Sequence, residues 1–462
     1  MILQQLYTKC LAQGAYFLSS NGEAAIVDPL REIQPYIELA REHHSKIKYI
    51  FLTHFHADFV SGQVDLAKAT GATVILGPTA QAGYNFHSAL DNEVFPVGDL
   101  TLTTIHTPGH TMESTCFLLK DSFGKAEALF TGDTLFIGDV GRPDLAAKSD
   151  LTTEDLAGHL YDSLHNRIAP LPDDLIIYPA HGAGSACGKN MSSDTSDTLA
   201  NQKATNYAFK LSKEAFIKEL TNGLATPPAY FPLNVAMNKK ENKSFQSIIE
   251  KGTTPLSVTD FEMLSKKEDV LVLDTRDVSA FAKAYIPQSW FIGLKGQFAP
   301  WVGSLVKDIH QKIIFIAAEG EEEEVVTRLA RVGYDNSLGY LEGGFAAWEA
   351  AGKPIEQIQE ITAQAFVEGL INKDIKHPVD VRKLGEYNTS HIEKVPHFAL
   401  SNIHFNINDL TSNKEYHIHC AGGYRSLIYA SIAKSYGIHK VVNVLGGYGA
   451  IKKVADSKLI LT

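Results

Sequence analysis

The sequence predicts an α/β protein of about three domains. The chain has 462 residues, which is more than one domain usually holds. In the first half, apolar runs typical of strands end repeatedly in Gly- or Pro-containing turns. In the second half, a stretch of about 100 residues with alternating strand and helix patterns occurs twice. Such alternation is typical of domains built around a parallel sheet.

The composition narrows the classes of function. The net charge of −11, from 42 basic and 53 acidic residues, argues against a nucleic-acid partner. No apolar run approaches the roughly 20 residues that span a bilayer, so no membrane partner is expected. The N-terminus lacks the basic region of a signal peptide. Four cysteines are too few for a disulfide framework, so a reducing, cytoplasmic setting is expected.

The most informative stretch is Thr53-His54-Phe55-His56-Ala57-Asp58-Phe59. It follows an apolar run that is typical of a buried strand. A turn at the end of a strand can aim His54, His56 and Asp58 at one point. Imidazole and carboxylate groups together suit a catalytic first-row metal, so the stretch predicts a metal site.

Further metal-type residues follow at three later strand ends. His110 lies in a Thr-Pro-Gly-His turn, Asp133 in a Thr-Gly-Asp-Thr turn, and His181 in a Pro-Ala-His-Gly turn. Most of the 18 histidines in the chain are explained as solvated or core residues. Four strand-end motifs in one order are not explained in that way, so these residues are candidate ligands.

These motifs carry a resemblance to a known family. Residues 1–250 resemble a metallo-β-lactamase-fold domain, an αββα sandwich, of the glyoxalase II and persulfide dioxygenase branch. Asp28 fits the early strand-end carboxylate that braces the metal loop in that family. The family motif runs His-x-His-x-Asp-His, and here Phe59, which cannot ligate a metal, replaces the last His. The segment from Gly132 to Asp144 is more similar to the persulfide dioxygenases than to the thioesterases.

The resemblance implies one Fe(II) per chain, with zinc as a misloaded alternative. The implied ligands are His54, His110 and Asp133. Two imidazoles and one carboxylate leave open positions at which O2 and a substrate can bind together. Supporting groups, or further ligands, are His56, Asp58 and His181. Arg142 is a candidate for binding the carboxylate of the carrier thiol, by resemblance only.

Three expectations concern the end of the first domain. Residues 182–198 are rich in Gly, Ser, Asp and Thr and predict a surface loop. The apolar spacing over residues 201–222 predicts a helix that closes the domain over its site. A boundary is expected near Gly252-Thr253-Thr254-Pro255.

The repeat then defines two similar domains, over residues 252–355 and 356–462. Asp274-Thr275-Arg276 is echoed by Asp380-Val381-Arg382, and each copy later carries a Gly-Gly-aromatic sequence. An aromatic residue follows each Asp at the same spacing, and an isoleucine follows the aromatic. These motifs resemble the rhodanese fold, although packing alone would explain them.

The second copy carries a candidate sulfur-transfer loop. A strand-like run delivers Cys420 to the sequence Cys-Ala-Gly-Gly-Tyr-Arg-Ser, which opens a helical run. Backbone N–H groups and a helix N-terminus create positive potential there, which lowers a thiol's pKa and stabilises a persulfide anion. Arg425 closes the loop, and the spacing matches the rhodanese Cys-x-x-x-x-Arg. The alternative is a buried, inert cysteine.

The first copy has no cysteine at this point. Its loop runs Ala317-Ala318-Glu319-Gly320 and continues with four glutamates that would repel an anionic sulfur donor. The preferred interpretation of these glutamates is a solvated helix start, which the helix dipole favours. We therefore expect a pseudo-rhodanese with a packing or docking role. Cys187, close to the His181 turn, is open to two interpretations, a sulfur relay and a solvated loop residue. Cys10 and Cys116 are expected in the core.

The whole chain resembles a persulfide dioxygenase–rhodanese fusion. The implied reaction oxidises a low-molecular-weight persulfide with O2 to sulfite, and Cys420 then moves a sulfane sulfur to give thiosulfate. The implied partners are the persulfide, O2 and sulfite, and the family implies a homo-oligomer. Two rival interpretations stay open. One is a thioester hydrolase of the glyoxalase II kind with two metals, and the other is a non-enzymatic sulfur-carrier scaffold. The sequence leaves open which thiol carries the sulfur.

Overall fold

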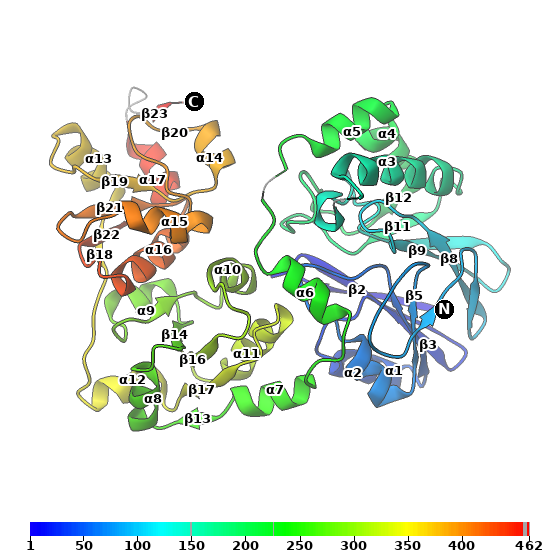
Figure 1. Ribbon diagram of the computed structural model, residues 1–462, viewed down its shortest axis with the longest axis horizontal. Helices are drawn as coiled ribbons and strands as arrows, with labels where there is room; N and C mark the ends of the chain where they lie inside the picture. Colours follow the sequence, from blue (N-terminus) through cyan, green and yellow to red (C-terminus); the bar gives the residue numbers. More distant parts are fainter. Residues whose placement is uncertain (148–149, 225, 456–459, 462) are drawn as a thin grey trace. The chain divides into compact units, whose positions relative to one another are not determined.

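The computed structural model describes residues 1–147, 150–224, 226–455 and 460–461 (Figure 1). The chain divides into two compact units. The first contains Met1–Phe245 together with Ala330–Gly333, and the second contains Gln246–Leu329 together with Tyr334–Thr462. Within the described residues, no helix is both long enough and apolar enough to cross a membrane.

The first unit contains two six-stranded sheets. One has the order β1-β2-β3-β4-β5-β6. Its strands are β1 (Ile2–Thr8), β2 (Gln13–Ser20), β3 (Glu23–Val27), β4 (Lys46–Leu52), β5 (Thr73–Leu76) and β6 (His87–Ser88). The other has the order β12-β11-β10-β9-β8-β7. Its strands are β7 (Val94–Val97), β8 (Leu100–His106), β9 (Thr115–Lys120), β10 (Ala126–Gly132), β11 (Ile176–Pro179) and β12 (Asp197–Thr198).

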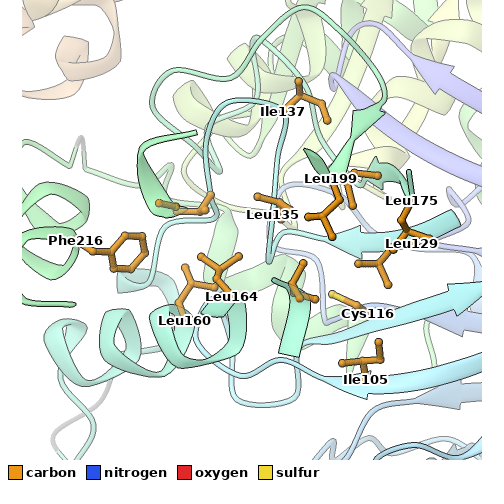
Figure 2. Close-up of a cluster of buried hydrophobic side chains, with 14 of the residues drawn as sticks. Ile105, Cys116, Leu129, Leu135, Ile137, Leu160, Leu164, Leu175, Leu199 and Phe216 are labelled. Atoms are coloured by element: carbon orange, nitrogen blue, oxygen red, sulfur yellow. The ribbon is translucent and has the colours of Figure 1, made fainter. Parts of the chain in front are cut away.

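Helices cover the outer faces of both sheets. α1 (Gln34–Glu42) and α2 (Gln63–Thr70) pack on the first sheet, and α3 (Thr153–Ser163), α4 (Leu199–Thr205) and α5 (Lys213–Thr221) pack on the second. Along β4, Ile50 faces the helices and Phe51 faces the other sheet, as the two-residue period of a strand requires. Figure 2 shows the helix-covered side of the second sheet, where Leu160 and Phe216 meet Leu129 and Cys116 in one cluster. The predicted αββα sandwich is confirmed.

The region after the second sheet differs from the prediction of one helix over residues 201–222. Asn206 has extended backbone angles (φ −72°, ψ 128°) and ends α4, while its side chain accepts a hydrogen bond from the N–H of Ala208. Ser212 then caps α5. Asn and Ser compete for backbone groups in this way, which explains why an apolar spacing typical of a helix is broken here. Helix α6 (Phe231–Asn238) follows, and then α7 (Phe245–Gly252), which the compact units place largely in the second.

The second unit holds two parallel sheets. The first has the order β13-β17-β16-β14-β15 and the second β18-β22-β21-β19. Their strands are β13 (Pro255–Leu256), β14 (Val270–Asp274), β15 (Trp290–Phe291), β16 (Lys312–Ile316), β17 (Ser337–Leu341), β18 (Gln359–Ile361), β19 (Pro378–Asp380), β21 (Tyr416–His419) and β22 (Val441–Val444). A separate pair is formed by β20 (His391–Ile392) and β23 (Ile460–Leu461). The four shared strands have the same order in both sheets, so the predicted repeat is a repeat of topology.

Helices connect these strands in both copies. The first copy contains α8 (Val258–Ser265), α9 (Val278–Lys283), α10 (Phe298–Leu305), α11 (Glu322–Arg331) and α12 (Gly344–Ala350). The second contains α13 (Ala363–Ile371), α14 (Leu384–Thr389), α15 (Ile403–Asn406), α16 (Tyr424–Ser435) and α17 (Gly447–Val454).

The repeated Asp-x-Arg motifs tie a strand end to a helix. In the first copy Arg276 donates three side-chain hydrogen bonds to the buried Asp274, and its guanidinium lies 4.1 Å from the centre of the Phe345 ring. In the second copy Arg382 pairs with Asp380 in the same way, and it lies 3.8 Å from the centre of the Tyr448 ring. The motif thus has a structural explanation in both copies.

Candidate metal centre and sulfur-transfer loop

Three of the predicted ligands converge at one edge of the sandwich. His54 follows β4, His110 follows β8, and Asp133 follows β10. All three side chains are buried, and one potential ligand atom of each lies within 4.8 Å of the others. Asp133 Oδ2 lies 3.8 Å from His54 Nε2 and 3.6 Å from His110 Nε2. Gly132 makes this approach possible, because its φ is +54° and a Cβ there would lie 2.5 Å from Thr53 Oγ1.

Hydrogen bonds fix which ring nitrogens face this point. The Thr53 hydroxyl donates to Asp28 Oδ2 (2.8 Å), so at its 3.0 Å contact with His54 Nδ1 it must accept. His110 Nδ1 lies 2.8 Å from the carbonyl oxygen of Arg142, to which it can only donate. Both histidines therefore carry a proton on Nδ1 and turn Nε2 toward Asp133.

The donor set fits a metal cation. Asp133 Oδ2 is buried and has no hydrogen-bond partner, although an unpaired buried carboxylate oxygen costs free energy. Burial lowers the pKa of His54 well below its usual value, and His56 adds to this. The 3.8 Å contact of His54 with Asp133 is therefore not an ion pair. The Nε2 atoms of two imidazoles and one carboxylate oxygen thus face a common point.

A second set of metal-type residues lies beside the first. His56, Asp58 and His181 also bring potential ligand atoms within 4.8 Å of one another, and all three are buried. His56 Nε2 lies 3.1 Å from Asp28 Oδ1. The Phe59 ring packs on the His56 ring with centroids 4.3 Å apart, so a phenyl group occupies the position next to this set.

His181 is engaged at both ring nitrogens. Its Nδ1 bonds Asp133 Oδ1 at 2.7 Å, and its Nε2 lies 2.9 Å from Asp58 Oδ2. Burial alone would lower the pKa of His181, but the two carboxylates outweigh burial and hold the pKa well above its usual value. The same contact helps to lower the pKa of Asp133, which burial alone would raise. Both nitrogens of His181 thus face carboxylate oxygens in this structure.

Arg142 and Cys187 lie close to the centre but differ from the expectations. The Arg142 guanidinium is paired with Asp144 through two bonds of 2.7 Å, while its carbonyl orients His110. A role of Arg142 in substrate binding stays a prediction. The solvated position considered for Cys187 is wrong, since this residue is 1% exposed and groups with Asp133 and His181. Burial, with the nearby carboxylates, raises the pKa of its thiol well above the usual value. Its relay role stays a prediction.

The other cysteines are free in the described structure. Cys116 is buried, as predicted. The core position predicted for Cys10 is wrong, since this residue is half-buried and its sulfur faces the Arg331 guanidinium at 3.4 Å.

Cys420 follows β21 and faces the start of α16. Its Sγ accepts a hydrogen bond from the N–H of Gly423 at 3.1 Å. Ser426 Oγ lies 3.5 Å from Sγ but only 2.7 Å from Asn443 Oδ1, so its proton is directed mainly to Asn443. The sulfur therefore faces a backbone donor at a helix N-terminus, where an anion is stabilised.

Arg425 is held by a residue that the sequence did not reveal. Glu386, in α14, accepts hydrogen bonds from both terminal nitrogens of Arg425, at 2.6 and 2.8 Å. Arg425 lies beside Cys420. Burial alone would lower the pKa of Arg425, but Glu386 outweighs burial and raises it. The first copy has Ala280 at the position of Glu386 and Glu322 at that of Arg425. It therefore lacks this pair as well as the cysteine.

Two families match the chain. The family described as Metallo-beta-lactamase superfamily matches residues 9–181, and the one described as Rhodanese-like domain matches residues 257–351 and 362–453. A metallo-beta-lactamase from Staphylococcus aureus subsp. aureus COL, of known crystal structure, is 30% identical, with a TM-score of 0.65. That match covers 74% of this chain and 98% of the other. The chain belongs to the metallo-beta-lactamase superfamily. Two rhodanese-like domains follow its superfamily domain, as the repeat predicted.

Relatives within the superfamily include enzymes of two kinds. Hydroxyacylglutathione hydrolase from Tolumonas auensis is 36% identical over 170 residues, which are 36% of this chain and 60% of the relative. Persulfide dioxygenase ETHE1, mitochondrial, from Homo sapiens is 28% identical over 244 residues, which are 52% of this chain and 88% of the relative. The chain thus spans less than two thirds of the hydrolase. These relatives support a metal-dependent enzyme.

Proposed function

We propose that this protein is a mononuclear iron persulfide dioxygenase with a fused sulfurtransferase. The observation that carries the proposal is the contrast between the two donor sets. His54, His110 and Asp133 present free lone pairs to one point. In the other set His181 bonds Asp133 through Nδ1 and lies 2.9 Å from Asp58 through Nε2, and Phe59 replaces a possible donor. The first position therefore has a complete set of protein donors, whereas the neighbouring one lacks the donor that Phe59 replaces.

Each residue at the centre has a defined task. An iron(II) held by His54, His110 and Asp133 would supply open positions for O2 and for the persulfide sulfur. Thr53 and Asp28 keep the Nδ1 proton of His54 away from the centre, and the Arg142 carbonyl does the same for His110. Burial of the whole set excludes bulk water, which strengthens the hold of Asp133 on a cation.

The overall reaction is RSSH + O2 + H2O → RSH + sulfite + 2 H+. The terminal sulfur loses four electrons, and O2 gains them. A sulfane sulfur carried on Cys420 can then be attacked by sulfite. The S–S bond to Cys420 breaks, a new S–S bond forms thiosulfate, and the Cys420 thiolate leaves into the field of the Gly423 N–H and the helix N-terminus.

A thioester hydrolase is the second candidate. The residues His56, Asp58 and His181 favour it because their ligand atoms are close enough to hold a second ion, and the hydrolase relative supports it. This activity requires two metals and a metal-activated water. Metal content therefore separates the two candidates.

The first test is metal quantitation of anaerobically purified protein, together with O2 uptake on several low-molecular-weight persulfides. One equivalent of iron and persulfide-dependent O2 uptake are expected. Two equivalents of metal in active protein, with thioester hydrolysis and no O2 uptake, would support the hydrolase instead. The series of persulfides also identifies the carrier thiol.

The second test is product analysis of wild-type protein and Cys420→Ser. The wild type is expected to release mainly thiosulfate, and the variant mainly sulfite at an unchanged rate of O2 uptake, because the iron ligands lie in the first unit. Equal sulfite release from the two proteins would rule out coupling. Loss of O2 uptake in the variant would show that the two sites are not independent.

A further inference from the structure

The helix that begins at the Cys420 loop is fastened to the copy that lacks the cysteine. Three hydrogen bonds join α16 to the segment around β15. The Tyr424 hydroxyl donates to the carbonyl of Gly293 at 2.9 Å. The N–H of Phe291 donates to Ser431 Oγ, and the indole N–H of Trp290 donates to Ser435 Oγ, each at 2.9 Å. Because these three α16 residues are spaced seven and four apart, they lie on one face of the helix.

Strand β15 is an edge strand, and α16 covers that edge. β15 pairs with β14 alone in its sheet, so the N–H of Phe291 has no strand partner. Ser431, which is 1% exposed, accepts this hydrogen bond. A buried serine on α16 is thus explained, because it accepts the hydrogen bond of an N–H group at the sheet edge. The contact belongs to the second unit and joins its two copies.

Tyr424 occupies a fitted position against the first copy. Its ring lies against Phe291, with centroids 5.8 Å apart in an edge-to-face arrangement. A Cβ added at Gly296 would lie 2.3 Å from Tyr424 Cζ and 2.5 Å from its hydroxyl oxygen, so only glycine leaves room for the ring. Burial raises the pKa of the Tyr424 hydroxyl well above its usual value. The hydroxyl therefore stays protonated and keeps donating.

The turn that receives Tyr424 is itself held by the first copy. The carbonyl of Leu294 accepts a hydrogen bond from Arg328 at 2.7 Å, and its N–H bonds the carbonyl of Thr275 at 2.9 Å. The N–H of Gly296 bonds the carbonyl of Gly293 at 3.2 Å and closes the turn. The acceptor for Tyr424 is thus fixed to the end of β14 and to α11.

Tyr424 lies in the Cys420 loop itself, so its contact with the first copy bears on the groups around the sulfur. Tyr424 stands between Gly423, whose N–H binds Cys420 Sγ, and Arg425, which lies beside the sulfur. A residue anchored between these two groups sets the direction of both. We propose that the Cys-less copy is a positioning element for the Cys420 loop and that it acts through Tyr424 seated on Gly293 and Gly296. This rests on the proposed role of Cys420 as the sulfur carrier.

The test uses the full-length protein with Tyr424→Phe, which removes one hydrogen bond, and Gly296→Ala, which displaces the ring. Two quantities are measured, the pH midpoint of iodoacetamide alkylation at the Cys420 peptide by mass spectrometry, and the kcat of thiosulfate formation with sulfite. In both variants the midpoint is expected to rise and kcat to fall about fivefold, the effect of losing one buried hydrogen bond. Tyr424→Phe keeps the ring and tests the idea even if Gly296→Ala does not fold.

Matched controls are Tyr436→Phe, an exposed tyrosine that follows the same helix, and Gly385→Ala, where an added Cβ meets no atom within 4 Å. Both are expected to match the wild type. In the double variant, the effects of Tyr424→Phe and Gly296→Ala should not add, because the two changes disturb one contact. Unchanged alkylation midpoints and kcat in both single variants would overturn the proposal. A different result is expected if Cys420 is not the sulfur carrier. In that case Cys420→Ser would still form thiosulfate.

Discussion

At the level of single residues, Phe59 is expected to limit the number of metal ions that the candidate centre binds. It is fully buried, and its ring packs on His56 beside the second donor set. Phe59→His restores an imidazole at this position, so we expect bound metal to rise from one toward two equivalents when the protein is loaded with zinc. Phe59→Leu is the matched control and should keep one equivalent. Metal analysis after dialysis measures both. Two equivalents in the wild type and in Phe59→Leu would contradict this assignment.

The buried His419, next to Cys420, is expected to make the free energy of unfolding depend on pH. Burial lowers the pKa of His419 to about 4 from the usual 6.5, against the opposing effect of Asp380, while Arg382 adds to the lowering. The unfolded chain therefore takes up this proton first as the pH falls. The stability contribution is complete above pH 6.5 and is lost as the pH falls toward 4, by up to about 3 kcal/mol.

This dependence can be measured by denaturant unfolding at pH 7 and pH 4.5. His419→Gln cannot titrate, so the free energy of unfolding should fall less between the two pH values than it does in the wild type. His310→Gln, at an exposed histidine, should behave like the wild type. An equal fall in His419→Gln and wild type would show that His419 does not cause the loss.

The sequence indicated the candidate ligands of the first set because each follows an apolar strand, and because His110 and Asp133 lie in Gly- or Pro-containing turns. It could not disclose the engagement of His181, since Asp58 and Asp133 meet it only after the two sheets pack. The partners Glu386 and Tyr424 were missed for the same reason. Nothing in their local sequence marks a contact with a residue far along the chain.

At the level of elements, the Asp-x-Arg pairs connect strands to helices. Arg382 joins the end of β19 to Tyr448 in α17, and Asp380 is fully buried. Removing the guanidinium leaves this buried carboxylate without its cationic partner, although the backbone N–H of residue 382 still donates to it. We expect Arg382→Met to lower the free energy of unfolding of the second unit by about 3–5 kcal/mol. Lys312→Met removes an exposed pair with Asp269 and should cost less than about 1 kcal/mol. Similar losses in the two variants would refute a special role of the motif.

Helices and strands were predicted well where the spacing of apolar residues and the positions of turn residues agreed. The strands before the metal ligands and the repeated strand order follow directly from apolar runs and turns. The helix expected over residues 201–222 failed, because Asn206 and Ser212 bind backbone groups and end or begin helices inside an apolar spacing. Local side-chain hydrogen bonds, rather than hydrophobic period, decide such boundaries.

At the level of the whole molecule, one chain carries both proposed sites. Tethering raises the effective concentration of sulfite at Cys420 if the geometry permits. The ratio of thiosulfate to O2 consumed should therefore be independent of protein concentration in the wild type. A mixture of Cys420→Ser and Asp133→Asn chains separates the two steps, and its ratio should fall on dilution. Product analysis over a concentration series measures this. A dilution-independent ratio in the mixture would show that tethering does not contribute.

In both rhodanese-like copies a helix begins after the corresponding strand, α11 after β16 and α16 after β21. The groups that lie at the N-terminus of this helix differ between the copies. In the second copy the Cys420 sulfur faces that end at α16. In the first, α11 begins with Glu322, Glu323 and Glu324, whose charges cannot leave. Fixed carboxylates thus hold the first helix start, whereas the second faces the Cys420 sulfur. If Cys420 carries sulfur as proposed, the duplicate would repel an anionic sulfur compound rather than compete for it.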